Sequence, residues 1–366
     1  MRILSCADLH LKLKHDKRYK RDLITSLNFL VDTIESQKPE FFIVAGDIFD
    51  TKYPTATEYA VFTAFLNRIS KLDVHTILIP GNHDTPNNSE EANTLKQFFN
   101  LKIDNLTVIH KPGIYNIYGL NILAIPYVHY DREEVLQMVK QLHDEYVGND
   151  LILVGHFWVD SYKIDNQDYT QNIHEFVVSE AYLKSLNKVK YYMLGHIHIG
   201  GRVFGNCYYL GSVFRTKTNE TEPEKSILLF EDDKVTKIVS PAMGIKEVLI
   251  SSTDDLNIDL SGITSTICHL KVKNLDIEFM SKINAVRKQL VDQGNYVYTD
   301  MDLKTIKFNA VTNSKPENLS QFFTNWIKMN NLMAEETTIK TLIQGIINGN
   351  ITEKTNFFDI KELNLK

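Results

Sequence analysis

The feature that most constrains this chain is a short apolar run that ends in a glycine and an aspartate. The run Phe41–Ala45 has the composition of a strand that is buried on both faces of a parallel sheet. Gly46 and Asp47 follow it at once, so Asp47 is expected where the strand ends. Open α/β sheets bind their ligands beyond the carboxyl ends of the strands. The chain is therefore predicted to be an α/β protein whose functional site includes Asp47.

Polar residues of similar types follow four further predicted strands. Asp8 and His10 follow a strand expected over residues 3–7, and in an extended segment these two side chains would point the same way. Strands are also expected over 75–79, 151–154 and 191–194, and they lead to Asn82, His83 and Asp84, to His156, and to His196 and His198. Apolar spacing predicts helices over about 23–34, 57–70, 132–145 and 179–186.

The collected side chains have the chemistry of a transition-metal site. They are imidazoles, carboxylates and one amide: Asp8, His10, Asp47, Asn82, His83, His156, His196 and His198. This mixture suits borderline divalent ions better than calcium, magnesium or a structural zinc. The set is too large for one ion, so we expect two ions about 3.5–4 Å apart, bridged by Asp47, as in two-metal hydrolysis. His83 would then protonate the leaving alcohol, with Asp84 orienting or tuning its imidazole.

The other seven histidines are interpreted as packed or surface side chains: His15, His75, His110, His129, His143, His174 and His269. The three cysteines lie far apart in the sequence and fit neither a disulfide framework nor a metal spacing, which predicts a reducing cytosol. No signal peptide precedes the first expected strand, and no apolar run approaches the roughly 18 residues of a membrane span. We therefore expect a cytoplasmic protein without a membrane partner.

The net charge of the 366-residue chain is −6, so any nucleic-acid binding must come from a local patch. Residues 12–21 offer one, with six lysines and arginines against a single aspartate. This stretch is either a solvated loop with the first turn of a helix, or a phosphate-contacting loop at the mouth of the site. The candidate phosphate contacts are Lys12, Lys14, Lys17, Arg18, Lys20 and Arg21.

Composition divides the chain into three predicted parts. The first covers residues 1–240, and the composition shifts near residues 241–244. Residues 246–311 have the pattern of a small α+β unit, with a strand over 267–272 and a helix over 277–292 that stops at Gly294. A linker at Lys315-Pro316 leads into residues 316–366, where two amphipathic helices are expected. These helices either bind a partner or pack on the preceding unit.

Five motifs together resemble the signature motifs of the calcineurin-like metallophosphoesterases, over roughly residues 1–230. They are Asp8-Leu9-His10, Gly46-Asp47-Ile48-Phe49-Asp50, Gly81-Asn82-His83-Asp84, Gly155-His156 and Gly195-His196-Ile197-His198. The resemblance implies a four-layer α/β/β/α sandwich. It also implies one metal on Asp8, His10, Asp47 and His198, and another on Asp47, Asn82, His156 and His196.

Finer features are similar to the SbcD-type DNA nucleases of bacteria and phages. Thr51 and Pro54 follow the Asp-Ile-Phe-Asp pattern, and Gly211-Ser212 resembles the Gly-Ser loop of these nucleases, although Val213 stands where they have proline. Protein-serine/threonine phosphatases carry Arg-Gly and Glu where this chain has Thr51-Lys52 and Asp84, so that subclass is disfavoured. The resemblance makes Ser212 and Arg215 candidate DNA contacts and residues 246–311 a DNA-contacting cap.

This resemblance implies a DNA nuclease subunit in repair, recombination or replication. It implies 3′-to-5′ exonuclease and endonuclease action on duplex ends and single strands, with two Mn²⁺ ions or Mg²⁺ as the alternative. The expected partners are an SbcC-type SMC-like ATPase, docked on the segment 316–366, and a second copy of the chain. The expected setting is a bacterial or phage-infected cell.

Two other functions use the same residues. A stand-alone phosphodiesterase or phosphatase for small phosphoesters, such as cyclic nucleotides, would need the same site but not the long segment after residue 240. A scaffold without catalysis would need the fold only, and the complete set of donor residues argues against it.

Overall fold

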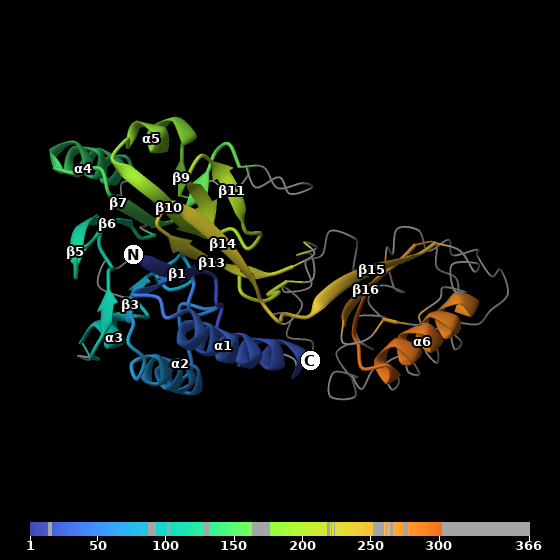
Figure 1. The fold of residues 1–366 in the computed structure, drawn as a ribbon. Helices are drawn as coiled ribbons and strands as arrows, with labels where there is room; N and C mark the ends of the chain where they lie inside the picture. The colour runs from blue at the N-terminus through green and yellow to red at the C-terminus, as the bar shows by residue number, and fades with distance from the viewer. Residues whose placement is uncertain are drawn as a thin grey trace, which may run out of the picture. The chain divides into compact units, whose positions relative to one another are not determined.

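The computed structural model describes residues 1–13, 17–86, 93–100, 103–127, 132–162, 176–217, 220, 222, 224–251, 260, 262–263, 266–273 and 277–301 (Figure 1). The chain divides into two compact units, Met1–Leu303 and Lys304–Lys366. The second unit lies outside the described residues, and with it the predicted helices of residues 316–366. Lys14 also lies outside them.

One six-stranded sheet carries the first three predicted strand ends. Its strands are β1 (Arg2–Cys6), β2 (Phe41–Ala45), β3 (His75–Ile79), β4 (Leu106–Val108), β13 (Ser226–Glu231) and β14 (Lys234–Val239), in the order β14-β13-β1-β2-β3-β4. Strands β1 to β4 are parallel, and β13 joins β1 antiparallel. The helices α1 (Lys17–Gln37), α2 (Ala56–Ile69) and α3 (Lys96–Asn100) share an apolar core with this sheet.

A second six-stranded sheet carries the last two strand ends. Its strands are β5 (Gly113–Ile117), β6 (Leu120–Ile125), β7 (Leu151–His156), β10 (Val189–Gly195), β11 (Gly201–Phe204) and β12 (Cys207–Tyr209), in the order β11-β12-β10-β7-β6-β5. The helices α4 (Arg132–Glu145) and α5 (Glu180–Ser185) belong to the outer side of this sheet, beside a small pair formed by β8 (Trp158–Val159) and β9 (Val177–Val178). The strands near residues 202–210 and 226–230 belong to different sheets.

The two sheets pack against each other through a shared apolar core. Alternation along β2 shows how: Phe42 and Val44 pack with the helices, whereas Ile43 and Ala45 pack toward the second sheet. Ile122 and Val154 contribute to the same inner core from β6 and β7. The expectation of a strand buried on both faces is confirmed, and the layers are α/β/β/α, as the resemblance implies.

A capping box defines the start of α2 and links it to the first strand end. The Thr55 hydroxyl accepts the backbone N–H of Glu58, and the Glu58 carboxylate accepts the backbone N–H of Thr55. The other oxygen of Glu58 accepts the N–H of Leu13 at 2.9 Å. The segment just after His10 is therefore fixed to the N-terminus of α2.

Residues 244–301 form a small parallel sheet with a core of its own. The strands β15 (Gly244–Ile250), β16 (Thr266–Val272) and β17 (Tyr296–Met301) lie in this order, with α6 (Ile277–Asp292) between β16 and β17. The predicted strand and helix are confirmed here, and Gly294 ends the helix with φ of 83°. The predicted division into domains stays a prediction.

Candidate metal centre

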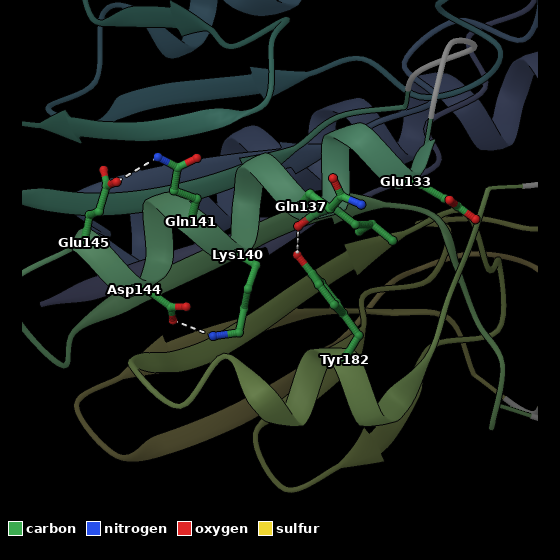
Figure 2. A pocket seen from close by; sticks show the side chains of 8 residues that line it. Glu133, Gln137, Lys140, Gln141, Asp144, Glu145 and Tyr182 are labelled. Atoms are coloured by element: carbon green, nitrogen blue, oxygen red, sulfur yellow. Dashed lines mark hydrogen bonds and ion pairs between the residues drawn. The ribbon is translucent and has the colours of Figure 1, made fainter.

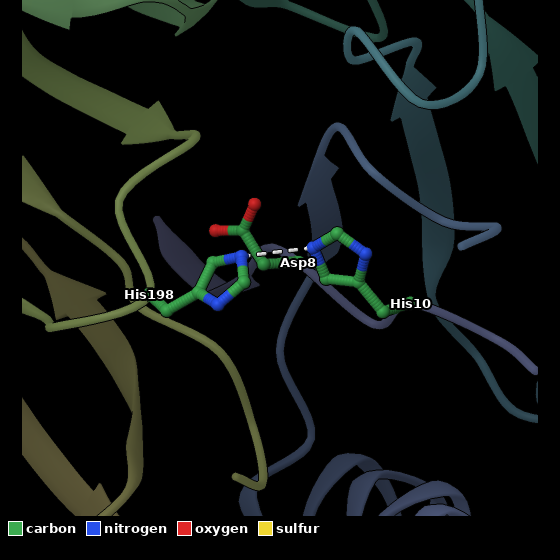
Figure 3. Close-up of side chains that lie close together, drawn as sticks. All are labelled: Asp8, His10 and His198. Atoms are coloured by element: carbon green, nitrogen blue, oxygen red, sulfur yellow. Dashed lines mark hydrogen bonds between the residues drawn. The ribbon is translucent and has the colours of Figure 1, made fainter. Parts of the chain in front are cut away.

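The candidate ligands come together at the carboxyl ends of β1, β2, β3, β7 and β10. Asp8, His10 and His198 offer ligand atoms that all lie within 4.8 Å of one another, and so do Asp8, Asp47 and His156. Figure 3 shows the first group, in which the imidazoles of His10 and His198 face each other beside the Asp8 carboxylate. Their Nε2 atoms are 2.9 Å apart. Both groups contain Asp8, so they form one continuous centre.

Asp47 presents its two carboxylate oxygens to different histidines. Oδ2 lies 3.6 Å from Nε2 of His10, and Oδ1 lies 3.4 Å from Nε2 of His156. Oδ1 also accepts the backbone N–H of His83 at 2.9 Å. A carboxylate with one oxygen toward each group of ligands has the arrangement that a bridging ligand needs.

Asn82 brings the second group together. Its side-chain oxygen lies 3.1 Å from Nε2 of His156 and 3.1 Å from Nδ1 of His196. The other ring nitrogen of His156, Nδ1, donates to the carbonyl of Ala45 at 2.8 Å, which leaves Nε2 as the nitrogen available to a metal. Asn82, His156, His196 and Oδ1 of Asp47 therefore form a second set of donors.

The backbone at these residues is not extended, contrary to what the i, i+2 spacing of Asp8 and His10 suggests. β1 ends at Cys6, and Asp8 and His10 have φ of 54° and 41°. Asp47 and His196 also have positive φ, at 50° and 87°. Each such residue costs roughly 1–3 kcal/mol and persists where the surrounding structure holds it. Asp8 and His10 do converge, but through a left-handed backbone rather than a strand.

Two glycines of the motifs are required by close approach. A Cβ on Gly46 would lie 2.1 Å from Nδ1 of His156, and Gly46 has φ of 88°. A Cβ on Gly81 would lie 2.2 Å from Oδ1 of Asp47. The glycine before Asp47 and the glycine before Asn82 thus leave room for ligands that arrive from other strands.

Burial and mutual charge shift the pKa values of this centre strongly. Burial alone would raise the pKa of Asp47, but the imidazoles of His156, His10 and His83 hold it well below its usual value. Burial would lower the pKa of His156, but Asp47 outweighs it and raises the pKa to about 9. Burial lowers the pKa of His196 to about 3. Burial raises the pKa of Asp8, with His198 opposing it.

The residues fit a divalent cation. Oδ1 of Asp8 accepts the backbone N–H of His196 at 3.1 Å, whereas Oδ2 is buried and has no hydrogen-bond partner among the described residues. A buried carboxylate oxygen that faces imidazoles without a donor is a costly arrangement unless a cation binds there. The neighbouring donors are carboxylate, imidazole and amide groups, which suit a transition-metal ion.

His83 and Asp84 occupy different parts of the site. Nδ1 of His83 donates to the backbone carbonyl of Asp50 at 2.6 Å, so Nε2 is the nitrogen left for proton exchange. The Asp84 carboxylate instead accepts the backbone N–H groups of Gly81, Ile48 and Phe49, each at 3.0 Å. These contacts do not support the expectation that Asp84 orients the His83 imidazole, since Asp84 ties together the loops after β2 and β3.

Three residues near the ligands were not assigned to the site from sequence. Asp50 places Oδ1 3.5 Å from Nδ1 of His10 and pairs with Lys12 at 2.7 Å. The buried Glu220 accepts Nδ1–H of His198 at 2.9 Å and pairs with the buried Lys225. Asp50 stands in a quoted motif three residues after Asp47, a signal that was present. Glu220 and Lys225 lie in an irregular segment without periodicity, so no pattern indicates them.

The predicted DNA contacts fall into exposed and buried residues, except Lys12, which is partly exposed and pairs with Asp50. Lys17, Lys20 and Arg21 are exposed at the start of α1. Arg18, Ser212 and Arg215 are buried, and Nη1 of Arg18 donates to the carbonyl of Arg215 at 2.9 Å. Arg215 itself donates to the carbonyls of Glu220, Glu222 and Met243. The burial of these three residues does not support a direct contact with DNA.

A hollow of the described surface lies away from the candidate ligands. It has a volume of about 700 Å³ and is lined by one face of α4 together with Tyr182 of α5 (Figure 2). Lys140 pairs with Asp144 there, and the Tyr182 hydroxyl donates to the carbonyl of Leu136. None of its lining residues belongs to the metal-ligand groups, so the hollow is not a candidate for the reaction site.

Facing mixed sheets with a carboxylate and imidazole centre at their strand ends define a metal-dependent phosphoesterase. The family model described as calcineurin-like phosphoesterase matches residues 1–200. The chain belongs to this family, and it is a metal-dependent hydrolase of phosphoesters whose His/Asp clusters are candidate sites of a dimetal centre.

The chain is similar to some solved structures at low sequence identity. A protein of Thermus thermophilus is 15% identical, with a TM-score of 0.42 over 65% of this chain and 98% of that one. A dimetal phosphatase from Danio rerio is 12% identical, with a TM-score of 0.41 over 65% of this chain and 95% of its own.

Within the described part of the chain, every helix is too short or too polar to traverse a bilayer.

Proposed function

We propose that this phosphoesterase is a DNA nuclease that acts on duplex ends and single strands, as the nuclease subunit of a complex with an SMC-like ATPase. The observation that carries the DNA substrate is the anchoring of the exposed basic start of α1 to the metal centre. The buried Tyr19 hydroxyl donates to the carbonyl of His10 at 2.6 Å. The exposed side chains of Lys17, Lys20 and Arg21 therefore belong to a turn that is fixed to a ligand loop.

This anchoring gives the basic residues a fixed relation to the reacting centre. Tyr19 is 1% exposed and Arg18 is 2% exposed, so the inward side of the first turn is immobilised by packing. Lysine and arginine side chains on the outer side supply sequence-independent attraction for a phosphate backbone. A small phosphoester would not need such a surface beyond the centre. The proposal therefore uses Lys17, Lys20 and Arg21, and not Arg18, Ser212 or Arg215.

The residues of the centre have separate tasks in phosphodiester cleavage. Two divalent ions, for which Mn²⁺ is proposed, would activate water and neutralise charge on a phosphoryl oxygen. Asp8, His10, Asp47 and His198 would hold one ion, and Asp47, Asn82, His156 and His196 the other. Nδ1–H of His83 donates to the Asp50 carbonyl, and Nε2 would deliver a proton to the leaving oxygen.

The remaining parts of the proposal rest on the resemblance of the motifs to SbcD-type nucleases. They are the cap function of residues 246–311, the docking of residues 316–366 on the ATPase, the homodimer, and a role in repair, recombination or replication in a bacterial or phage-infected cell. A small α/β unit with its own core, β15 to β17 with α6, follows the sandwich and is available for the cap function.

The test is cleavage of end-labelled linear duplex DNA by the full chain with Mn²⁺. A small chromogenic phosphodiester serves as the second substrate, and His83→Ala is run beside the wild type. Stepwise loss of the labelled 3′ end by the wild type alone would support the proposal. Hydrolysis of the small ester with DNA left intact, also after addition of the ATPase subunit, would contradict it and favour a stand-alone phosphodiesterase.

A further inference from the structure

We infer that Glu220 is a positioning residue that fixes the metal-binding nitrogen of His198, and that it acts on only one of the two ions. The inference rests on the metal centre of the proposed function and not on DNA as its substrate. Oε1 of Glu220 lies 2.9 Å from Nδ1 of His198, while Nε2 of the same ring faces His10 (Figure 3). One ring nitrogen thus contacts the carboxylate and the other points into the centre.

The carboxylate determines which nitrogen of His198 carries the proton. Glu220 is an acceptor when ionised, so Nδ1 of His198 must donate and Nε2 keeps its lone pair. Carboxylates in this position fix the ring orientation of metal-binding histidines and raise their basicity. The Thr216 hydroxyl oxygen also lies 2.8 Å from Nδ1 of His198, but its proton is donated to Glu220. Without Glu220 this hydroxyl is free to donate to Nδ1 instead, Nε2 would then carry the proton, and that tautomer does not bind a metal.

Glu220 is itself held rigidly by several donors. Oε1 accepts the Thr216 hydroxyl at 2.6 Å and the backbone N–H of Lys217 at 3.0 Å. Oε2 accepts the Ser212 hydroxyl at 3.2 Å and pairs with Lys225. Side chains of Glu220 and Lys225 are only 5% and 2% exposed, so the pair is shielded from water. A residue fixed in this way is able to set the orientation of the ring that it contacts.

Lys225 links this cluster back to the ligand. Its ammonium donates to the backbone carbonyl of His198 at 3.0 Å and to the Ser212 hydroxyl at 2.8 Å. It also pairs with Glu222, whose carboxylate oxygens accept no hydrogen bond from the His198 ring. Glu220 and Glu222 therefore share one cation, but only Glu220 contacts the ligand. The chain thus offers two acids that pair with the same lysine for an experiment, with Glu220 5% exposed and Glu222 13% exposed.

The other ligand histidines are oriented differently. Nδ1 of His156 donates to the carbonyl of Ala45, and Nδ1 of His196 faces Asn82. For His10, the nearest carboxylate oxygen belongs to Asp50, at 3.5 Å from Nδ1. Among the described ligand histidines, His198 is the one with a carboxylate within 3.0 Å of a ring nitrogen. Loss of Glu220 should therefore weaken the ion on Asp8, His10 and His198 and spare the ion on Asn82, His156 and His196.

The experiment is a calorimetric titration of the metal-free full chain with Mn²⁺, without DNA or any phosphoester. Wild type, Glu220→Gln and Glu222→Gln are compared. We expect Glu220→Gln to weaken the affinity for one Mn²⁺ by about 10–100-fold and to leave the other unchanged. Glu222→Gln should bind both ions as the wild type does.

Three results would overturn the inference: wild-type affinities in Glu220→Gln, equal weakening of both ions, or the same loss in Glu222→Gln. If Glu220→Gln does not fold, the ¹⁵N resonances of the wild-type histidines decide, with His198→Gln used for assignment. A proton on Nδ1 of metal-free His198 supports the role of Glu220, and a proton on Nε2 alone overturns it. Failure of the wild type to bind two ions would refute the metal centre itself. If the chain does not cleave or bind DNA, the result of the titration is unaffected, because no DNA is present.

Discussion

The Nε2 atoms of His10 and His198 lie 2.9 Å apart, although the two residues are 188 positions apart in the chain. At this distance at most one of the two nitrogens carries the proton between them, so at least one lone pair points into the gap. Two imidazoles aimed at the same point, beside the Asp8 carboxylate, have the arrangement of ligands to one ion. The first and last motifs of the sequence therefore form one end of the metal centre.

Replacement of Asp47 by alanine should remove both ions. Its two carboxylate oxygens face His10 and His156, which belong to different groups of ligands. We expect the affinity for both Mn²⁺ ions to fall by more than about 100-fold, since even outer contacts of metal ligands contribute 10–100-fold. His156→Ala is the control and should lose one ion only. Metal analysis after dialysis that shows two ions retained in Asp47→Ala would refute the bridge.

Replacement of His83 by alanine should slow catalysis strongly without loss of metal. Its ring contacts the Asp50 carbonyl and packs edge-on against His10, with ring centroids 4.8 Å apart. Loss of a general acid lowers a rate by about 10²–10⁴-fold. We expect that decrease in kcat for a small phosphodiester, with wild-type Mn²⁺ content. A parallel loss of metal would show that His83 is a ligand and not the proton donor.

Asp84→Asn should destabilise the fold more than it alters proton transfer. The carboxylate accepts three backbone N–H groups, from Gly81, Ile48 and Phe49, and asparagine has one oxygen and a donor in its place. We expect the free energy of unfolding to fall by about 2–4 kcal/mol in urea titrations. The pH dependence of kcat should keep its wild-type form. Wild-type stability with a shifted pH profile would instead restore the role of Asp84 as a partner of His83.

The sequence predicts well which polar side chains come together, because the pattern is local at each strand end. An apolar run followed by glycine and a polar residue marks where β2, β7 and β10 end, and parallel strands bring such ends to one edge. The local conformation was less predictable. Asp8 and His10 have positive φ because backbone contacts hold them, with their N–H groups on the carbonyls of Gly46 and Asp47 at 3.0 and 2.9 Å.

Long-range features were missed for a physical reason. β13 pairs with β1 across the chain, with Leu4 opposite Leu229, and no local pattern states which of two sheets it joins. Glu220 and Lys225 lie in a charged stretch of the sequence that is typical of an exposed loop. Both are nevertheless buried, because they form an ion pair next to His198. Arg18 is basic and stands in a basic stretch, which is typical of a phosphate contact. Its guanidinium instead donates to the backbone carbonyl of Arg215.

Charge reversal at Lys17, Lys20 and Arg21 should weaken DNA binding and flatten its salt dependence. The three side chains are exposed at the start of α1, which is fixed to His10 through Tyr19. Each lost phosphate contact should reduce the slope of log K against log salt by about 1, hence by up to about 3 in the triple variant. Lys38→Glu, just past the other end of the helix, is the matched control and should leave the slope unchanged. An unaltered slope in the triple variant would make this stretch a solvated surface.

His75 should make the fold less stable as the pH falls below about 6.5. Its Nε2 lies 2.8 Å from the Thr107 hydroxyl, and its ring packs against Phe41 and Tyr118. Partial burial lowers the pKa of His75 from its ordinary value of 6.5, so the unfolded chain takes up the proton first on acidification. The contribution of neutral His75 to the free energy of unfolding is complete above pH 6.5. It is lost progressively as the pH falls toward the lower pKa of the folded state.

His75→Gln keeps a polar side chain without this titration, which gives a direct measurement. Urea unfolding of both chains at about pH 7.5 and about pH 5.5 yields the stability that each loses on acidification. The histidines of the metal centre contribute equally to both chains and cancel in the comparison. We expect the wild type to lose more stability than His75→Gln between these two pH values. Equal losses in the two chains would show that His75 has the same pKa in the folded and unfolded states.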